Sequence, residues 1–193
     1  MMFAQLQCAA EHANLQLVSE LSPLQLGSGI KSGGQAIPHI VRELAERFEE
    51  DSNNALLKVD GENAFNMFNR NERVKAFRKY LPGLSRFIEY LYCNEAPLLF
   101  CGEEIITSEV GSMQGCPLGG IAFAVPIHEI ILEINKEVPD LDLNVWFFDD
   151  SNIMGRASEP TKLSKRKGPK SVFTCAPTSL SAGALRRIKK FPK

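Results

Sequence analysis

The feature that most constrains the fold is an apolar run ending in two adjacent acids, Val145-Trp146-Phe147-Phe148-Asp149-Asp150, followed by residues 151–155. Bulky apolar and aromatic residues favour β-strands, whereas Asp favours turns. The pattern therefore predicts two short strands joined by a tight turn, with both acids exposed at its tip. Taken alone, the acid pair has a simpler interpretation, because Asp occurs in turns for purely backbone reasons.

Composition predicts a soluble, intracellular globular protein. The chain has 193 residues, 44% of them hydrophobic, enough for one sizeable core or for one domain with a tail. No segment approaches the roughly 18 uncharged apolar residues of a membrane span, and the first residues lack the basic start of a signal peptide. The five cysteines have no CxxC spacing, which indicates neither a disulfide framework nor a zinc site.

Charge divides the chain into two parts at about residue 155. Residues 151–193 hold 11 of the 22 Lys and Arg residues but one of the 23 Asp and Glu residues. We therefore predict a domain over residues 1–155 and a basic, poorly ordered tail over residues 156–193. The runs at residues 165–167 and 186–190 suit phosphate binding or nuclear import, and equally suit a solvated chain end.

Hydrophobic spacing predicts alternating strands and helices within residues 1–155. The expected helices cover about residues 3–17, 37–48, 74–77, 84–91 and 118–137, and the expected strands cover 56–60, 97–100 and 105–108. Pro38 falls in the first turn of its helix, where proline is tolerated, whereas Pro126 falls inside its helix and should kink it. The glycine-rich segment 27–34 is expected to be a connector.

A third acid, Asp60, ends the strand predicted for residues 56–60, 89 residues before Asp149. Carboxylate oxygens are the ligands that Mg²⁺ prefers, and phosphoryl transfer uses such groups clustered around two ions about 4 Å apart. Only the fold could bring Asp60 to the acid pair. The three histidines are too widely separated to suggest a further metal site.

The order of these segments resembles that of reverse transcriptases. Asp60-Gly61-Glu62-Asn63-Ala64-Phe65-Asn66 is similar to motif A of non-LTR retrotransposon-like enzymes, and Gln114-Gly115-Cys116-Pro117-Leu118 is similar to the core of motif B. Residues 147–150 resemble motif C, with Phe147 in place of the common Tyr. The resemblance covers about residues 20–155.

The resemblance implies an α+β, polymerase palm-like domain with an antiparallel sheet and helices packed on one face. It implies RNA-directed DNA synthesis from an RNA template, a DNA primer and deoxynucleoside triphosphates, with Mg²⁺ or Mn²⁺ as cofactor. The implied catalytic and metal-binding residues are Asp60, Asp149 and Asp150. The implied substrate-binding residues are Gly61, Asn63, Ala64, Phe65, Gln114 and Gly115, among which Phe65 would exclude a 2′-hydroxyl.

Several family features have no counterpart in the sequence. Lys31 and Arg42 are only loose candidates for the basic residues that hold the triphosphate, and no primer grip or helical thumb follows Gly155. A non-catalytic remnant that binds nucleic acid through its basic tail is therefore an alternative. Another palm-type nucleotidyl transferase is a weaker alternative, because it leaves the segment around Gln114 unexplained.

Overall fold

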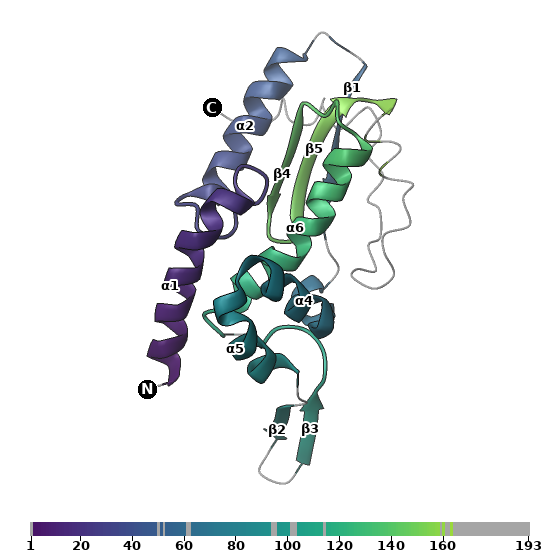
Figure 1. Cartoon of the computed structure of the whole chain (residues 1–193). Helices are drawn as coiled ribbons and strands as arrows, with labels where there is room; N and C mark the ends of the chain where they lie inside the picture. Colours follow the sequence, from purple (N-terminus) through teal and green to yellow (C-terminus); the bar gives the residue numbers. More distant parts are fainter. Residues whose placement is uncertain are drawn as a thin grey trace.

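A computed structural model describes residues 2–49, 51, 53–60, 63–93, 96–100, 104–113, 115–158, 160 and 163, with the backbone alone at 2–3, 96–100 and 104–106. The helices are α1 (Met2–Leu21), α2 (Gly33–Arg47), α3 (Ala64–Met67), α4 (Arg70–Tyr80), α5 (Pro82–Tyr92) and α6 (Gly119–Glu137). The strands are β1 (Asn54–Val59), β2 (Ala96–Phe100), β3 (Glu104–Ser108), β4 (Leu143–Phe147) and β5 (Asp150–Arg156) (Figure 1).

The strands form two antiparallel sheets. A three-stranded sheet has the order β1-β5-β4, and β2 pairs with β3 in a hairpin at one end of the molecule (Figure 1). The predicted α+β class and antiparallel sheet are confirmed. The longer predicted helices and strands are also present, each with ends shifted by a few residues, and Pro82 starts α5 as the break predicted there required.

Helix α6 covers one face of the three-stranded sheet. Leu57 of β1, Ile153 of β5 and Trp146 of β4 share a buried cluster with the α6 side chains Phe123, Ile127, Ile131 and Ile134. Residues alternate between the two faces along a strand, so the side chains next to these three in sequence point away from α6.

The opposite face of the sheet also carries a helix, which corrects the prediction that helices pack on one face only. Val145 of β4 is buried against Ile37 of α2, with Leu143 and Phe147 packed beside it. The glycine-rich connector turns the chain so that the apolar side of α2 reaches this face. Within the described residues, α2 contacts β4 more extensively than β1 or β5, so it covers chiefly the β4 side of the sheet.

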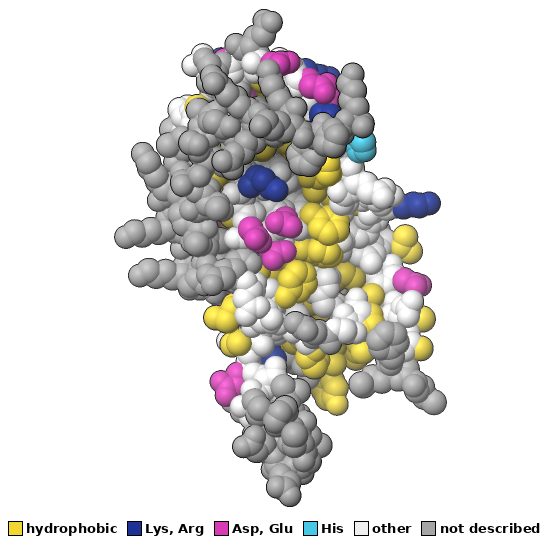
Figure 2. Space-filling model, turned by 180° about the vertical axis from the view of Figure 1, so that it is seen from behind, with side chains coloured by type: hydrophobic (Ala, Val, Ile, Leu, Met, Phe, Trp, Pro, Cys, Tyr) yellow, Lys and Arg dark blue, Asp and Glu magenta, His cyan; other side chains and the backbone are white. Residues whose placement is uncertain are grey.

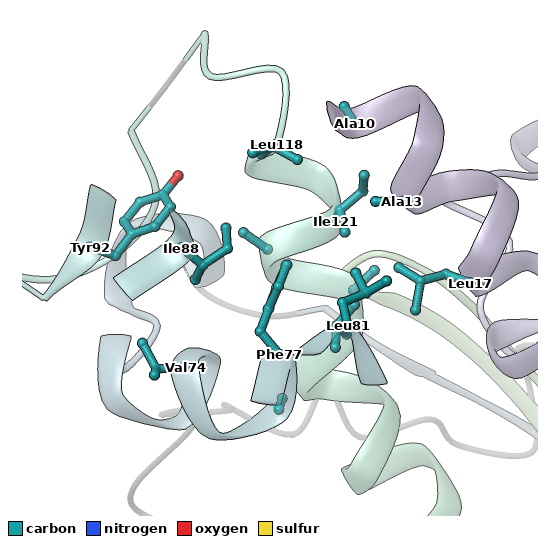
Figure 3. Close-up of a cluster of buried hydrophobic side chains, with 14 of the residues drawn as sticks. Ala10, Ala13, Leu17, Val74, Phe77, Leu81, Ile88, Tyr92, Leu118 and Ile121 are labelled. Carbon is teal, nitrogen blue, oxygen red and sulfur yellow. The ribbon is translucent and has the colours of Figure 1, made fainter. Parts of the chain in front are cut away.

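The N-terminal half of α6 belongs to a second, helical core. Figure 3 shows Ala13 and Leu17 of α1 and Phe77 of α4 pointing toward Ile121 of α6. The buried α1 residues recur every three or four positions, at Leu6, Ala10, Ala13, Leu17 and Leu21. Helix α6 therefore connects the helical core to the core beneath the sheet, and its residues from Ile121 to His128 are all buried.

Pro126 lies inside α6, and a side chain of α4 compensates for the donor that it lacks. The carbonyl of Ala122 would normally accept a hydrogen bond from the backbone N–H four residues later, which proline does not have. Instead, Nε of Arg73 donates to the Ala122 oxygen at 2.9 Å. A buried arginine thus satisfies a carbonyl that the helix itself cannot pair.

None of the helices in the described part of the chain is both long and apolar enough to cross a membrane.

Candidate active site

The pairing of β1 with β5 brings Asp60 to the acid pair. Val59, the last residue of β1, is opposite Ser151, so Asp60 and Asp150 extend the same register by one position. Both lie on the face turned away from α6, since Leu57 and Ile153 point toward it. Figure 2, which views the molecule from behind, shows a group of acidic side chains (magenta) near the middle of this face.

The turn between β4 and β5 differs in one respect from the prediction. Phe147 pairs with Asp150, so the two central turn residues are Phe148 and Asp149 rather than the two acids. Asp150 opens β5 and is exposed, whereas Asp149 is half-buried in the turn. Phe148 has a φ of 55°, a left-handed conformation that is unusual for a bulky residue.

The three aspartates influence one another electrostatically. Burial raises the pKa of Asp149 above its usual value, and the negative charges of Asp150 and Asp60 raise this pKa further, against the opposing effect of its own backbone N–H. Within the described residues, no three His, Cys, Asp or Glu side chains are already arranged as a metal site. The acids are therefore neighbours whose repulsion a cation would relieve, without forming a closed set of ligands.

The residues after Asp60 place Phe65 beside the β4–β5 turn. Its ring stacks on Phe123 of α6, with centroids 4.3 Å apart, and meets the ring of Phe148 edge-on at 5.6 Å. Ala64 is buried in the core under the sheet, and Asn63 is exposed with a φ of 49°. The half-buried Phe65 therefore combines core packing with a position next to the residue that precedes Asp149.

The loop that precedes α6 is joined to the segment containing Phe65. The N–H of Ser112 donates to the Phe65 carbonyl at 2.7 Å, and the N–H of Gly111 donates to the Phe68 carbonyl at 3.0 Å. Gly111 has a φ of 73°, and a Cβ there would overlap the backbone of Asn66. The loop that leads into the motif B-like residues is thus bonded to the motif A-like segment, although nothing in their spacing required it.

Two arginines of α4, which the sequence analysis did not identify, hold this loop. Arg73 is fully buried, donates to the Gly111 carbonyl at 3.1 Å and to the Ser112 hydroxyl at 2.8 Å, and lies 4.2 Å from the centre of the Tyr92 ring. Burial lowers the pKa of Arg73 to about 10. Arg70 donates to the carbonyls of Ser108, Val110 and Gly111. Arg73 lies four residues before the buried Phe77 and Arg70 lies seven residues before it, so all three share one side of α4. This helical spacing is the sequence signal that could have revealed the two arginines.

The other predicted site residues are placed only in part. Gly115 is exposed, and its φ of 80°, rather than any close neighbour, accounts for the glycine. Gly61 and Gln114 lie outside the described residues, as do residues 164–193, which make up most of the predicted basic tail. Lys31 and Arg42 are both exposed, and no contact places either next to the acids within the described part of the chain.

The residues before α2 lie along the outer side of β4. Trp146 donates to the Leu24 carbonyl and its own carbonyl accepts from Leu26 N–H, both at 2.7 Å, which makes a short parallel bridge centred on Gln25. Gln25 is fully buried beside the β4–β5 turn. The resemblance covers this segment as a whole, but nothing in the sequence indicates a role for Gln25.

Comparisons with known proteins add no family to these observations. No protein-family model matches the chain, and no curated protein matches it either. The interpretation of the site therefore depends on the chain's own residues and their arrangement.

Proposed function

We propose that this chain carries the palm-like part of a reverse transcriptase, whose reaction is RNA-directed DNA synthesis by two-metal nucleotidyl transfer. The observation that carries the proposal is the register of β1 and β5. It ends with Val59 opposite Ser151, so the chain continues to Asp60 beside Asp150, with Asp149 in the adjoining turn. Asp60 therefore lies near enough to the turn to raise the pKa of Asp149, although the two residues are 89 positions apart in sequence. A turn that contained Asp for backbone reasons alone would not need Asp60 beside it.

The donor set fits Mg²⁺ or Mn²⁺. Carboxylate oxygens are hard ligands, and Asp149 is held where burial and its two neighbours make its charge unfavourable without a cation. Asp60, Asp149 and Asp150 would hold the ions, which when bound neutralise charge on the transferring phosphoryl group. The chain's own contribution is to keep the three carboxylates at the end of a paired sheet rather than on a free loop.

Phe65 is the residue proposed to select the sugar of the incoming nucleotide. Its ring is supported from one side by Phe123 and touches Phe148, which fixes it beside the residue that precedes Asp149. A supported aromatic ring presents a fixed apolar surface, against which a 2′-hydroxyl would be both crowded and unpaired. The preferred substrates would then be deoxynucleoside triphosphates.

Primer extension tests this function. The purified chain would be given an oligo(dT) primer on poly(rA), dTTP, and Mg²⁺ or Mn²⁺, beside Asp149→Asn and the control Asp142→Asn. Asp142 is an acid immediately before β4, at the far end of the strand from the turn. We expect extension by the wild type and the control but not by Asp149→Asn.

Absence of extension by the folded wild type would refute the enzymatic proposal for this chain. If RNA still bound, with an affinity that fell steeply with salt and was lost on deletion of residues 156–193, the non-catalytic alternative would be favoured. That alternative has in its support the 11 basic residues of segment 151–193.

A further inference from the structure

The turn between β4 and β5 is held by a side chain from outside the sheet. The Oε1 atom of Gln25 accepts hydrogen bonds from the N–H of Phe148 at 2.8 Å and from the N–H of Gly27 at 2.9 Å. Its Nε2 atom donates to the carbonyl of Phe148 at 3.1 Å. One buried amide therefore pairs with both backbone polar groups of Phe148.

This arrangement matters because the backbone of Phe148 is in an unfavourable conformation. A bulky residue at a φ of 55° is an outlier that persists only where its surroundings enforce it. The hydrogen bonds from Gln25 enforce it on the backbone, and close packing enforces it on the ring. A Cβ on Gly120 would lie 3.1 Å from the Phe148 ring, and one on Gly27 would lie 2.9 Å from the Phe148 nitrogen.

We propose that Gln25 is a positioning residue of the candidate site, which fixes the backbone of Phe148 and thereby holds the Asp149 carboxylate beside Asp60 and Asp150. Gln25 does not touch a metal or substrate in this proposal, and acts only through the turn. The positioning of the turn is independent of the proposed function. Its consequence for metal affinity rests on that function.

The side chain is well suited to this role. Glutamine offers an acceptor and a donor on one planar group, which matches the N–H and C=O of a single residue. Because Gln25 is fully buried, removal of its polar atoms would leave both groups of Phe148 without this partner. The left-handed turn would then lose the contacts that favour it over ordinary turn conformations.

Three variants of the full chain test the proposal: Gln25→Met, Gln25→Glu and the control Gln35→Met, since Gln35 is an exposed residue of α2. In the metal-free protein, NMR would measure the exchange protection of the Phe148 amide and the chemical shift of the Asp149 amide. Calorimetry would measure the Kd for Mn²⁺.

For Gln25→Met we expect the Phe148 protection factor to fall at least about tenfold and the Asp149 amide shift to change, because the freed turn can leave its left-handed conformation. We expect Mn²⁺ binding to weaken about tenfold, as is typical when a residue supporting a metal ligand is removed. The control should change none of these quantities. Unchanged Phe148 protection and an unchanged Asp149 amide shift in folded Gln25→Met would overturn the proposal.

The Gln25→Glu variant tests the hydrogen bonds to Phe148 directly. Its ionised carboxylate would accept from the two N–H groups but repel the Phe148 carbonyl, whereas the protonated acid could donate to that carbonyl. Protection at Phe148 should therefore increase as the pH falls in this variant alone, and a pH-independent protection factor would contradict the proposal. This series also decides the question if Gln25→Met does not fold.

The two proposals fail in distinguishable ways. If the wild type bound no Mn²⁺ and extended no primer, the proposed function would be refuted, whereas the protection of Phe148 and the Asp149 amide shift would still establish or refute the positioning by Gln25.

Discussion

Replacement of Arg73 by Met tests the account of Pro126 and of the loop before α6. Methionine has a similar length and fits an apolar site, but it offers no donor to the Ala122 carbonyl, which has no helical partner of its own. The Gly111 carbonyl keeps its bond from Arg70, so it is not left alone. The perturbation therefore exposes chiefly one carbonyl and one aromatic contact.

The expected cost is a difference between opposing terms. An unpaired buried carbonyl costs about 2 kcal/mol, the guanidinium over the Tyr92 ring contributes about 2 kcal/mol when desolvated, and the bond to the Ser112 hydroxyl contributes about 1 kcal/mol. Against these, burial lowers the pKa of Arg73 from 12.5 to about 10, a penalty of about 3 kcal/mol that disappears with the charge. The net destabilisation should be about 2 kcal/mol.

Urea unfolding followed by circular dichroism would measure this change. The control is Arg78→Met on the same helix, where an exposed ion pair to Glu89 should contribute less than about 1 kcal/mol. Pro126→Ala restores a backbone N–H for the Ala122 carbonyl, so Arg73→Met should cost about 1–2 kcal/mol less in that background. An equal cost in both backgrounds would refute the idea that Arg73 compensates for the proline.

Further predictions concern the site. Gly111→Ala should destabilise the fold by about 2 kcal/mol or more, because the positive φ of Gly111 and the nearby backbone exclude a side chain. The control Gly83→Ala, which has open space around it in α5, should be neutral or stabilising by up to about 1 kcal/mol. Thermal unfolding of both variants would measure the difference. Phe65→Ala should lower the free energy of unfolding by about 2 kcal/mol, since a half-buried ring stacked on Phe123 is removed. Under the proposed function this variant should also incorporate more ribonucleotides. An unchanged ratio of incorporated ribonucleotide to deoxynucleotide would count against the sugar-selecting role. Because the pKa of Asp149 is raised in the folded state, the ionised carboxylate destabilises the fold at pH values above that pKa. Asp149→Asn should therefore raise the Tm of the metal-free protein at neutral pH. This increase in Tm should shrink as the pH falls through the raised pKa toward the pKa of the unfolded chain. Equal Tm values at neutral pH would contradict the repulsion, and added Mg²⁺ should stabilise the wild type more than the variant.

Local patterns predicted the elements well. The apolar run and acid pair of the β4 and β5 segments, and the three-to-four-residue spacing in α5 and α6, located these elements to within a few residues. The reason is that each pattern records which face of one element is buried, and this is a local property of the chain. The exact turn was less predictable, because pairing of Phe147 with Asp150 moved Phe148 into it.

The packing of α2 was not predictable in the same way. Its apolar face was evident, but the choice of sheet face depended on a connector whose path is set by contacts such as the bridge to Trp146. Arg70 and Arg73 were missed for a related reason. Arginine is rarely buried, and what permits it here is a set of backbone carbonyls contributed by other elements.

The sequence by itself determined which residues could bind a cation and which segments could form strands. The reason is that carboxylate chemistry is a property of single residues and hydrophobic spacing is a property of short segments. Tertiary structure alone decided that Val59, next to Asp60, lies opposite Ser151, next to Asp150, that the loop at Ser112 is joined to Phe65, and that Gln25 is bonded to the turn. These relations depend on strand register and on hydrogen bonds between segments up to 123 positions apart, and no local pattern records which distant group will become a residue's partner.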